Sequence, residues 1–353
     1  MRYLDIREED EIDKAQFVAW GCEMTRSRKH HFVQQAHLRL FEDTAHRLTV
    51  GGKDGSRFRP TTGSIFAERD LYAYEVDGET TSEFEDRLTE IENETFPALH
   101  ELARTRVLAA NAIPRIRTYI TTSFVRNPSQ RAGVMAMYQH AVTAAMRIAD
   151  ARGLLQPLPN SGTPYDGKTV PELVDSGAVI INIKNEKFLE AMQLVFETTL
   201  RLIGAFELSL VISPEGRIAI GDHPLTLLHP AIDGGPYGIP FGGRNCELTF
   251  PVSKHVCLVG RWQDKFPNSD AAQAVEQINR RQVLFASKHV AVEGELGSVE
   301  DMLDLYANVS FKTEVQTLPF ANGGAVMPMR RGLLPTSEWQ KVRGDIVELR
   351  SVL

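Results

Sequence analysis

The sequence contains few cysteines and no long uninterrupted hydrophobic run. Cys22, Cys246 and Cys257 have no Cys-x-x-Cys spacing, which excludes a disulfide framework and a cysteine-ligated zinc site. The most hydrophobic window, 188–212, is interrupted by charged residues that a membrane-spanning helix would not tolerate cheaply. The N-terminus also lacks the apolar core of a signal peptide. These absences predict a cytoplasmic protein with free thiols and no membrane partner.

Several well-marked catalytic motifs are missing as well. The sequence has no His-Glu-x-x-His zinc motif and no Gly-x-Ser-x-Gly nucleophile turn. The glycine cluster at 234–243 lacks the Lys-Ser or Lys-Thr that completes a phosphate-binding loop. An enzymatic site in this chain must therefore be inferred from scattered polar residues rather than from one compact motif.

The balance of charge is acidic, with one basic region. The formal net charge is −7 and the sequence pI is about 5.9, so the field of the whole molecule does not attract nucleic acid or anionic lipid. A short stretch is nevertheless rich in arginine: Arg104, Arg106, Arg115, Arg117, Arg126 and Arg131. This stretch indicates either a local anion site or ion pairs with the acidic segment that precedes it.

Hydrophobic periodicity predicts helices in the first part of the chain and strands after residue 205. Apolar residues recur at helical spacing over 81–108, 134–152 and 185–204, with Asn185 expected to cap the third helix. The turn-rich stretch 51–63 is typical of an exposed loop. Strand-like runs follow at 206–212, 217–220, 246–252 and 255–262, then helices from Ser269 and over 336–352. The order predicts an α+β fold, in which a helical N-terminal part packs on a strand-rich section followed by C-terminal helices.

The densest group of chemically versatile residues lies at 28–43. It places three histidines, two glutamines and an arginine among apolar residues. Within it, His30-His31-Phe32-Val33-Gln34-Gln35-Ala36-His37-Leu38-Arg39-Leu40-Phe41 resembles the opening signature of the domain of unknown function 4238 family, His-His-x-Val-Pro-Gln-x-Tyr-Leu-Arg-x-Phe. Gln34 stands where that family has proline, and His37 stands where it has tyrosine.

The resemblance continues along the chain in the same order. Ala67-Glu68-Arg69-Asp70-Leu71-Tyr72 is similar to the family's Ala-Glu-Lys-Asp-Phe-Tyr segment, and Gly221-Asp222-His223-Pro224 to its Ser-Asp-Asn-Pro turn. Thr249–Ser253 resembles a family strand, and Asn279 falls in a late Leu-Asn helix. The resemblance implies a domain over 29–292, between a charged N-terminal arm at 1–28 and a C-terminal helical extension at 293–353. It nominates polar positions but implies no reaction.

The first functional hypothesis is a metal-assisted hydrolase that acts on phosphodiesters. Imidazole and carboxylate ligands can hold a divalent cation that activates water and neutralises charge on phosphorus. His30, His31 and Asp222 are the expected ligands, with His223 and Glu68 completing the catalytic set. The substrate would be a nucleic acid or a nucleotide. This hypothesis requires the His30-His31 segment to meet the Asp222-His223-Pro224 turn in space.

Three other interpretations remain open. In a metal-free hydrolase, His31 would transfer protons, Asp222 would orient it, and Arg39 or Arg117 would hold the anion. In a binding or sensing module, Arg115, Arg117 and Arg126 would recognise an anionic ligand or partner, with Arg39 and Asn279 as further contacts. Alternatively, the histidines and Asp222 serve only to hold the backbone. The sequence does not determine the oligomeric state.

Overall fold

The computed structural model describes residues 29–76, 79–81, 83–228, 246–262 and 272–315, with short segments at 318–319, 325–326, 329–334, 345–346 and 349. The predicted arm at 1–28 lies outside these residues, as do Cys22, the stretch 229–245, Ser269 and nearly all of the terminal helix predicted over 336–352. None of the helices in the described ranges is both long and apolar enough to cross a membrane.

The described residues form eight α-helices, of which α2, α4 and α6 are the longest, with 23, 24 and 20 residues. Their bounds are α1 (Gln35–Leu38), α2 (Glu83–Thr105), α3 (Ile113–Val125), α4 (Pro128–Ala151), α5 (Val170–Asp175), α6 (Asn185–Gly204), α7 (Ala272–Phe285) and α8 (Ser298–Leu305). Short 3₁₀ turns occur at η2 (Arg39–Phe41), η3 (Thr62–Ser64) and η4 (Ala110–Ala112). The helices predicted over 81–108, 134–152 and 185–204 are confirmed, and α4 is followed by Gly153 at φ 69°, as a C-terminal glycine requires.

The strands form several small antiparallel sheets. Their bounds are β1 (Lys29–His31), β2 (Thr49–Gly52), β3 (Arg57–Phe58), β4 (Ala67–Arg69), β5 (Tyr74–Val76), β6 (Glu79–Thr81), β7 (Phe206–Ile212), β8 (Ile220–Gly221), β9 (Thr226–Leu228), β10 (Glu247–Ser253), β11 (Val256–Trp262), β12 (His289–Val292), β13 (Ser310–Val315), β14 (Leu318–Pro319), β15 (Ala325–Val326) and β16 (Met329–Leu334). One four-stranded sheet has the order β7-β11-β10-β9 and another the order β3-β2-β12-β8.

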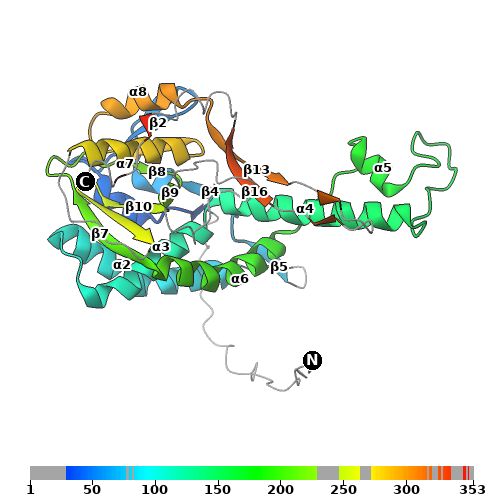
Figure 1. The fold of residues 1–353 in the computed structure, drawn as a ribbon, viewed down its shortest axis with the longest axis horizontal. Helices are drawn as coiled ribbons and strands as arrows, with labels where there is room; N and C mark the ends of the chain where they lie inside the picture. Colours follow the sequence, from blue (N-terminus) through cyan, green and yellow to red (C-terminus); the bar gives the residue numbers. More distant parts are fainter. Residues whose placement is uncertain are drawn as a thin grey trace, which may run out of the picture.

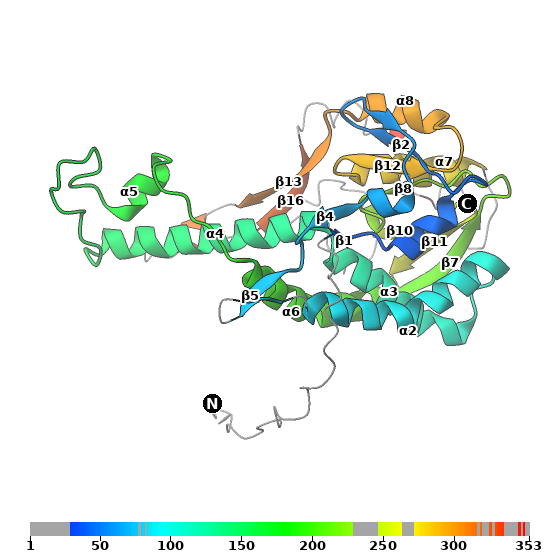
Figure 2. The same cartoon turned by 180° about the vertical axis from the view of Figure 1, so that it is seen from behind.

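The sheet of β7, β11, β10 and β9 has the longer strands and is called the larger sheet below. It separates two parts of the core. Leu208 and Leu210 of β7 pack with residues of α2 and α3, whereas Val211, which points to the other face, packs with Ile278 of α7. Figures 1 and 2 show the corresponding layers, with α2, α3 and α6 on one side of the sheet and α7 and α8 on the other. The structure thus confirms the predicted α+β class.

Two predictions about local structure were wrong. The stretch 51–63 is not wholly a loop, because β2 and β3 pair across it. Gly51 in β2 allows α8 to pack closely on this strand, since a Cβ there would lie 2.3 Å from Leu303. The region 293–353 is not wholly helical either: α8 is followed by β13, which pairs with β16. In the sequence of β13, Ser-Phe-Lys-Thr-Glu-Val, the strand-favouring residues Phe311, Thr313 and Val315 stand at every second position.

Asn185 does not cap α6 as predicted. The N-cap is Lys184, and Asn185 is the first helical residue. Its side-chain amide instead donates to the carbonyls of Leu71 and Ala73, at 3.1 and 2.7 Å. Asn185 therefore anchors the chain between β4 and β5 to the start of α6.

Candidate functional site

The two adjacent histidines of β1 point to opposite faces of the strand. β1 pairs antiparallel with β4, so that His30 lies opposite Glu68. Side chains alternate along a strand, and accordingly His30 is buried while His31 is partly exposed. Burial lowers the pKa of His31, and its Nε2 has no hydrogen-bond partner among the described residues. The pair cannot direct both rings at one metal ion.

The ring of His30 has a structural partner. Its Nδ1 accepts a hydrogen bond from the backbone N–H of Tyr72 at 3.0 Å, and the ring stacks on that of Tyr72 with 5.6 Å between centroids. Metal binding through Nε2 would leave a proton on Nδ1, facing the Tyr72 N–H. His30 therefore fixes the turn after β4 and is unsuited to ligate a metal in this arrangement.

Arg126 is the centre of a buried polar cluster. Its guanidinium forms an ion pair with Glu92 of α2 and donates to the His31 carbonyl and, at 3.2 Å, to Tyr72 Oη. Its side chain is only 3% exposed, so the guanidinium does not face solvent. The ion pairing that the sequence indicated between the arginine-rich stretch and the acidic helix is confirmed at this residue. The hypothesis that Arg126 binds an external anion is not supported.

Asp222 holds the turn that joins α7 to β12. One carboxylate oxygen accepts from the N–H of Ser287 at 2.7 Å, and the other from Lys288 at 2.7 Å and His289 at 3.1 Å. Burial raises the pKa of Asp222, while these three donors and the nearby Lys53 charge oppose the rise. Most of the hydrogen-bonding capacity of this carboxylate is thus directed at the backbone.

Lys53 supports the same turn from the side of β2. Its Nζ donates to the Leu284 carbonyl in the last turn of α7, at 3.0 Å, and to the Val309 carbonyl at 2.8 Å. Burial lowers the pKa of Lys53 to about 8, although the charge of Asp222 acts in the opposite direction. The sequence analysis did not single out Lys53, because nothing near it in the chain indicates that its amine is enclosed.

Asn127 and His223 also bind to nearby backbone. Asn127 Nδ2 donates to the Asp222 carbonyl at 2.7 Å, and its Oδ1 accepts from the Ser129 N–H at the start of α4. The Nδ1 of His223 lies 2.7 Å from the Leu225 carbonyl, and its ring meets that of Phe124 edge-on. These contacts fasten the Asp222 turn to the helical layer.

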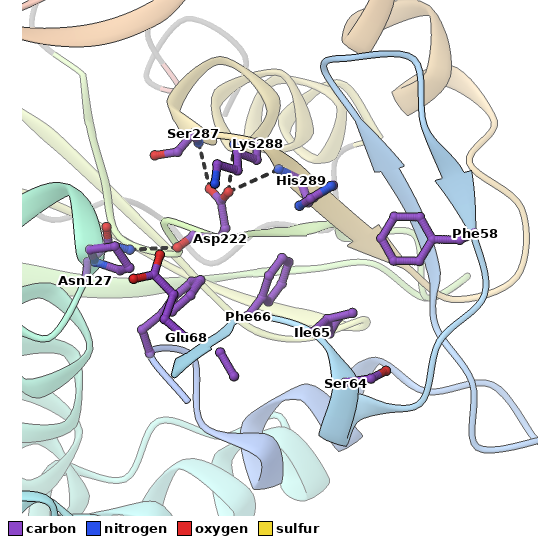
Figure 3. Close-up of a pocket in the computed structure, with 13 residues that line it drawn as sticks. Phe58, Ser64, Ile65, Phe66, Glu68, Asn127, Asp222, Ser287, Lys288 and His289 are labelled. Atoms are coloured by element: carbon purple, nitrogen blue, oxygen red, sulfur yellow. Dashed lines mark hydrogen bonds between the residues drawn. The ribbon is translucent and has the colours of Figure 1, made fainter. Parts of the chain in front are cut away.

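A cavity of about 270 Å³ opens beside this turn. Figure 3 shows Asp222 and Asn127 on one side of it and Phe66 and Ile65 on another, with Glu68 directed toward Asn127 and Asp222. Its lining comes from six separate segments: Phe32, Phe58, Ser64, Ile65, Phe66, Ala67, Glu68, Asn127, Pro128, Asp222, Ser287, Lys288 and His289. Four of these side chains are ionisable, and three are aromatic rings of phenylalanine.

The backbone is strained at the wall of this cavity. Phe66 has φ 51°, a left-handed conformation that bulky residues rarely adopt. Its carbonyl accepts hydrogen bonds from the N–H groups of Phe32 and Val33, at 2.9 and 3.4 Å, which hold it in place. Strain of this kind concentrates at functional sites. The position of Phe66 therefore supports a role for the cavity beyond packing.

The predicted site is assembled only in part. Glu68 and Asp222, 154 positions apart in the sequence, line the same cavity, and β1 lies beside Glu68. His30, His31 and His223 are not among its lining residues. In the described ranges, no group of three or more His, Cys, Asp or Glu side chains could hold a metal ion. The predicted His30, His31 and Asp222 metal site is thus not formed by the described residues.

The remaining candidate ligand-binding residues lie elsewhere. Arg39 and Arg115 are exposed, and Arg117 donates to the Phe206 carbonyl at 2.8 Å. Asn279 spans the backbone of the chain before β8, accepting from Ala219 N–H at 2.8 Å and donating to the Arg217 carbonyl at 2.7 Å. Asn279 also lines a second cavity, of about 420 Å³. The structure does not unite these residues in one anion site.

Sequence reasoning missed Lys288, His289 and the aromatic wall. Lys288 lies between α7, which ends at Phe285, and β12, which begins at His289. The signal available was their position at a helix-to-strand junction, where polar side chains often reach a site. The ring of Phe58 meets that of His289 edge-on at 5.5 Å, which orients the imidazole at the cavity wall.

His37 lies in the core rather than in the cavity. It is fully buried among the rings of Phe41, Tyr119 and Phe250, and its Nε2 lies 3.0 Å from the Pro251 carbonyl. Burial lowers the pKa of His37 to about 4. The aromatic surroundings suit the tyrosine that the family signature has at this position.

This burial of His37 predicts a pH-dependent stability. Below pH 6.5 the unfolded chain binds a proton at this ring, but the folded chain does not until the pH approaches 4, so stability falls as the pH falls through this window. Between pH 7.5 and 5.0 the loss from this residue is expected to be about 2 kcal/mol. Urea denaturation at both pH values should show that His37→Phe removes this part of the loss, whereas His46→Phe, at an exposed position, retains it. An equal pH dependence in both variants would contradict the prediction.

Comparisons with known proteins bear on the identity of the chain. The family model described as "Protein of unknown function (DUF4238)" matches residues 29–293, which is most of the sequence. The chain belongs to the DUF4238 family. The match includes β1, β4, the Asp222 turn and all the lining residues of the cavity of about 270 Å³ beside that turn, which is called the Glu68 cavity below. Neither the curated proteins nor the solved structures provide a match. For this DUF4238 protein, the function must therefore be argued from the site itself.

Proposed function

We propose that the protein is a hydrolase that cleaves small phosphodiesters of the nucleotide class in the Glu68 cavity, without a metal ion. The observation that carries this proposal is the convergence of Glu68, Lys288 and His289 on one cavity with an aromatic wall. Concave sites with an apolar lining and a few convergent polar groups are the usual form of small-molecule sites. The volume of about 270 Å³ lies at the small end of the range for small-molecule sites, so the ligand must be small.

Each lining group supplies one requirement of phosphodiester hydrolysis. Lys288 attracts the anionic phosphate, and Phe58 and Phe66 provide flat apolar surface for a nucleobase. Glu68 accepts a proton from the attacking water, whose oxygen forms a bond to phosphorus. The protonated form of His289 donates a proton to the leaving oxygen as the bond between that oxygen and phosphorus breaks. Proton transfer of this kind requires no change in oxidation state.

The engagement of Asp222 favours this metal-free form over the metal-assisted one. Three backbone N–H groups already direct the Asp222 carboxylate into the α7–β12 turn. A divalent cation at the cavity would have Glu68 as its main carboxylate ligand, whereas such ions in proteins take several oxygen or nitrogen ligands. In the proposed mechanism Asp222 is a positioning residue that fixes the backbone of Lys288 and His289.

A second candidate function is the binding of an anionic nucleotide-like ligand without turnover. It is favoured by the number of hydrogen bonds that tie Asp222 and Asn127 to the backbone, because a rigid pocket suits recognition as well as catalysis. In this case Lys288 and the phenylalanine wall would act as described, and Glu68 would accept a hydrogen bond from the ligand.

Turnover by the wild-type protein distinguishes the two candidates. The assay uses bis(p-nitrophenyl) phosphate and the four 2′,3′-cyclic nucleotides in buffer containing EDTA, with thermal unfolding of the same mixtures measured in parallel. Hydrolysis that persists in EDTA is the expected result. A rise in the unfolding temperature without hydrolysis would transfer the conclusion to the binding function. The absence of both effects would contradict both candidates, and hydrolysis only after addition of Mn²⁺ or Mg²⁺ would contradict the metal-free form.

A further inference from the structure

The helix α4 is apolar, and the described residues cover it only in part. Only three of its 24 residues are charged, Arg131, Arg147 and Asp150, and none of the 24 is buried. The much shorter helix α3 buries seven of its 13 residues. Figures 1 and 2 show that α4 leaves the body of the molecule and projects outward, with α5 near its far end. A helix with few charges is normally buried on at least one side.

One face of α4 is an apolar stripe that is half-buried at Tyr138 and Ala149 and exposed at Val142 and Ala145. Tyr138, Val142, Ala145 and Ala149 follow one another at spacings of four, three and four residues, so they share one face. At the start of α4, Val134 and Met135 pack against the core. Farther out, Val142 is 39% exposed and Ala145 is exposed as well. The apolar face that the sequence predicts over 134–152 thus continues beyond the part of the helix that packs on the core.

The segment that returns from α5 adds to this apolar surface. Gln139 on α4 donates to the Ile181 carbonyl at 3.0 Å, which places the returning chain beside the helix, and Ile180 is 84% exposed there. Twelve described residues are large, apolar and exposed. Seven of them lie in the projecting arm, residues 128–184: Val142, Leu154, Leu158, Tyr165, Val170, Val179 and Ile180. Such a concentration marks an interaction surface.

The distribution of charge indicates what covers the arm. Residues 128–184 contain five basic and four acidic residues, so the arm has a net charge of +1, whereas the rest of the chain carries −8. A nearly neutral surface offers little attraction to nucleic acid or anionic lipid. It also permits contact with an identical surface, while the acidic bodies of two molecules would repel each other. A projecting arm allows contact at a distance from those bodies.

We propose that the arm, α4 with its return segment, pairs with the arm of a second copy of this chain around a two-fold axis. In such a dimer the stripe of Tyr138, Val142 and Ala145 lies against the same stripe of the partner, with the two α4 helices antiparallel. A helix of 24 residues is about 36 Å long. Val134 and Met135 at its start pack against the core, so the pairing uses the outer part of α4 together with the return segment at Ile180. A stable interface of standard size buries roughly 800 Å² per partner, which this pairing must reach. This inference does not depend on the proposed hydrolase function.

Sedimentation velocity on the full chain at 1–100 μM tests the proposal. The expected mass is twice the 39.4 kDa of the chain. The variant Val142→Glu/Ala145→Glu should be monomeric, with a dissociation constant raised at least about 100-fold, because pairing would bury like charges. The matched control is His140→Glu, on the opposite side of α4, which should remain dimeric. Far-UV circular dichroism verifies that each variant is folded.

Three results would overturn the proposal. The wild type could sediment as a monomer over the whole concentration range. The double variant could dimerise as well as the wild type, which would place the interface elsewhere. A monomer that co-sediments with phosphatidylcholine vesicles would assign the arm to a membrane surface instead of a second copy.

Discussion

Replacement of Arg281 by leucine is expected to lower the free energy of unfolding by about 3–5 kcal/mol, because it removes the buried guanidinium that pairs with the buried Glu247 carboxylate. Arg281 of α7 and Glu247 of β10 are both fully buried, and their side chains lie 2.7 Å apart. The same carboxylate accepts from the N–H of Leu349 at 2.7 Å. This contact ties the C-terminal part of the chain to the larger sheet.

The double variant Arg281→Leu/Glu247→Leu should be more stable than Arg281→Leu alone, since it removes both charges and fills the space with apolar atoms. Arg104→Leu is the matched control: its ion pair with Glu101 is more than half exposed, so the change should have little effect on the free energy of unfolding. Urea denaturation of the four proteins measures these differences. A loss below about 1 kcal/mol for Arg281→Leu would contradict the account of the buried pair.

Much of the fold could be predicted because its signals are local. The apolar spacing in α2 and α6 and the β-branched residues of β7 and β11 indicate the element type within a single window. The β2–β3 hairpin was missed because its glycines suggest a loop. A glycine is required at position 51 because Leu303, 252 positions away, lies close to it. A local stretch of the sequence does not include both residues, so it cannot indicate this contact.

The candidate site was harder to predict, since its chemistry depends on partners distant in sequence. His30 and Asp222 are residues that bind metals in many proteins, but here backbone N–H groups of Tyr72 and of 287–289 occupy their acceptor atoms. Residue type alone does not distinguish these roles. Glu68 and Asp222, which the family segments nominated together, line the same cavity, and their catalytic role stays a prediction.

The helix α4 gives a different lesson. Its apolar face was evident from the sequence, and so was its end at Gly153. What could not be predicted is where that face points, because periodicity identifies an apolar surface but not the molecule that covers it. The structure assigns Val134 to the core and leaves Val142 exposed on the same helix.

The largest effect on activity is expected for Glu68→Gln. The amide keeps the shape of the side chain but cannot accept the proton of the attacking water, so kcat should fall by about 10²–10⁴-fold. The Michaelis constant should stay within about threefold, because the change removes a contribution made in the transition state and leaves Lys288 and the phenylalanine wall intact. A role for Glu68 in folding alone would alter stability and leave kcat of the folded fraction unchanged.

The central claim, that hydrolysis occurs in the Glu68 cavity, is tested most directly by kcat for bis(p-nitrophenyl) phosphate in EDTA, measured for the wild type and Glu68→Gln at equal folded concentration. Glu101→Gln, an exposed change on α2, provides the matched control. The account predicts turnover by the wild type and the control, and a loss of at least about 100-fold for Glu68→Gln. Equal turnover by all three proteins would place the chemistry outside this cavity and contradict the claim.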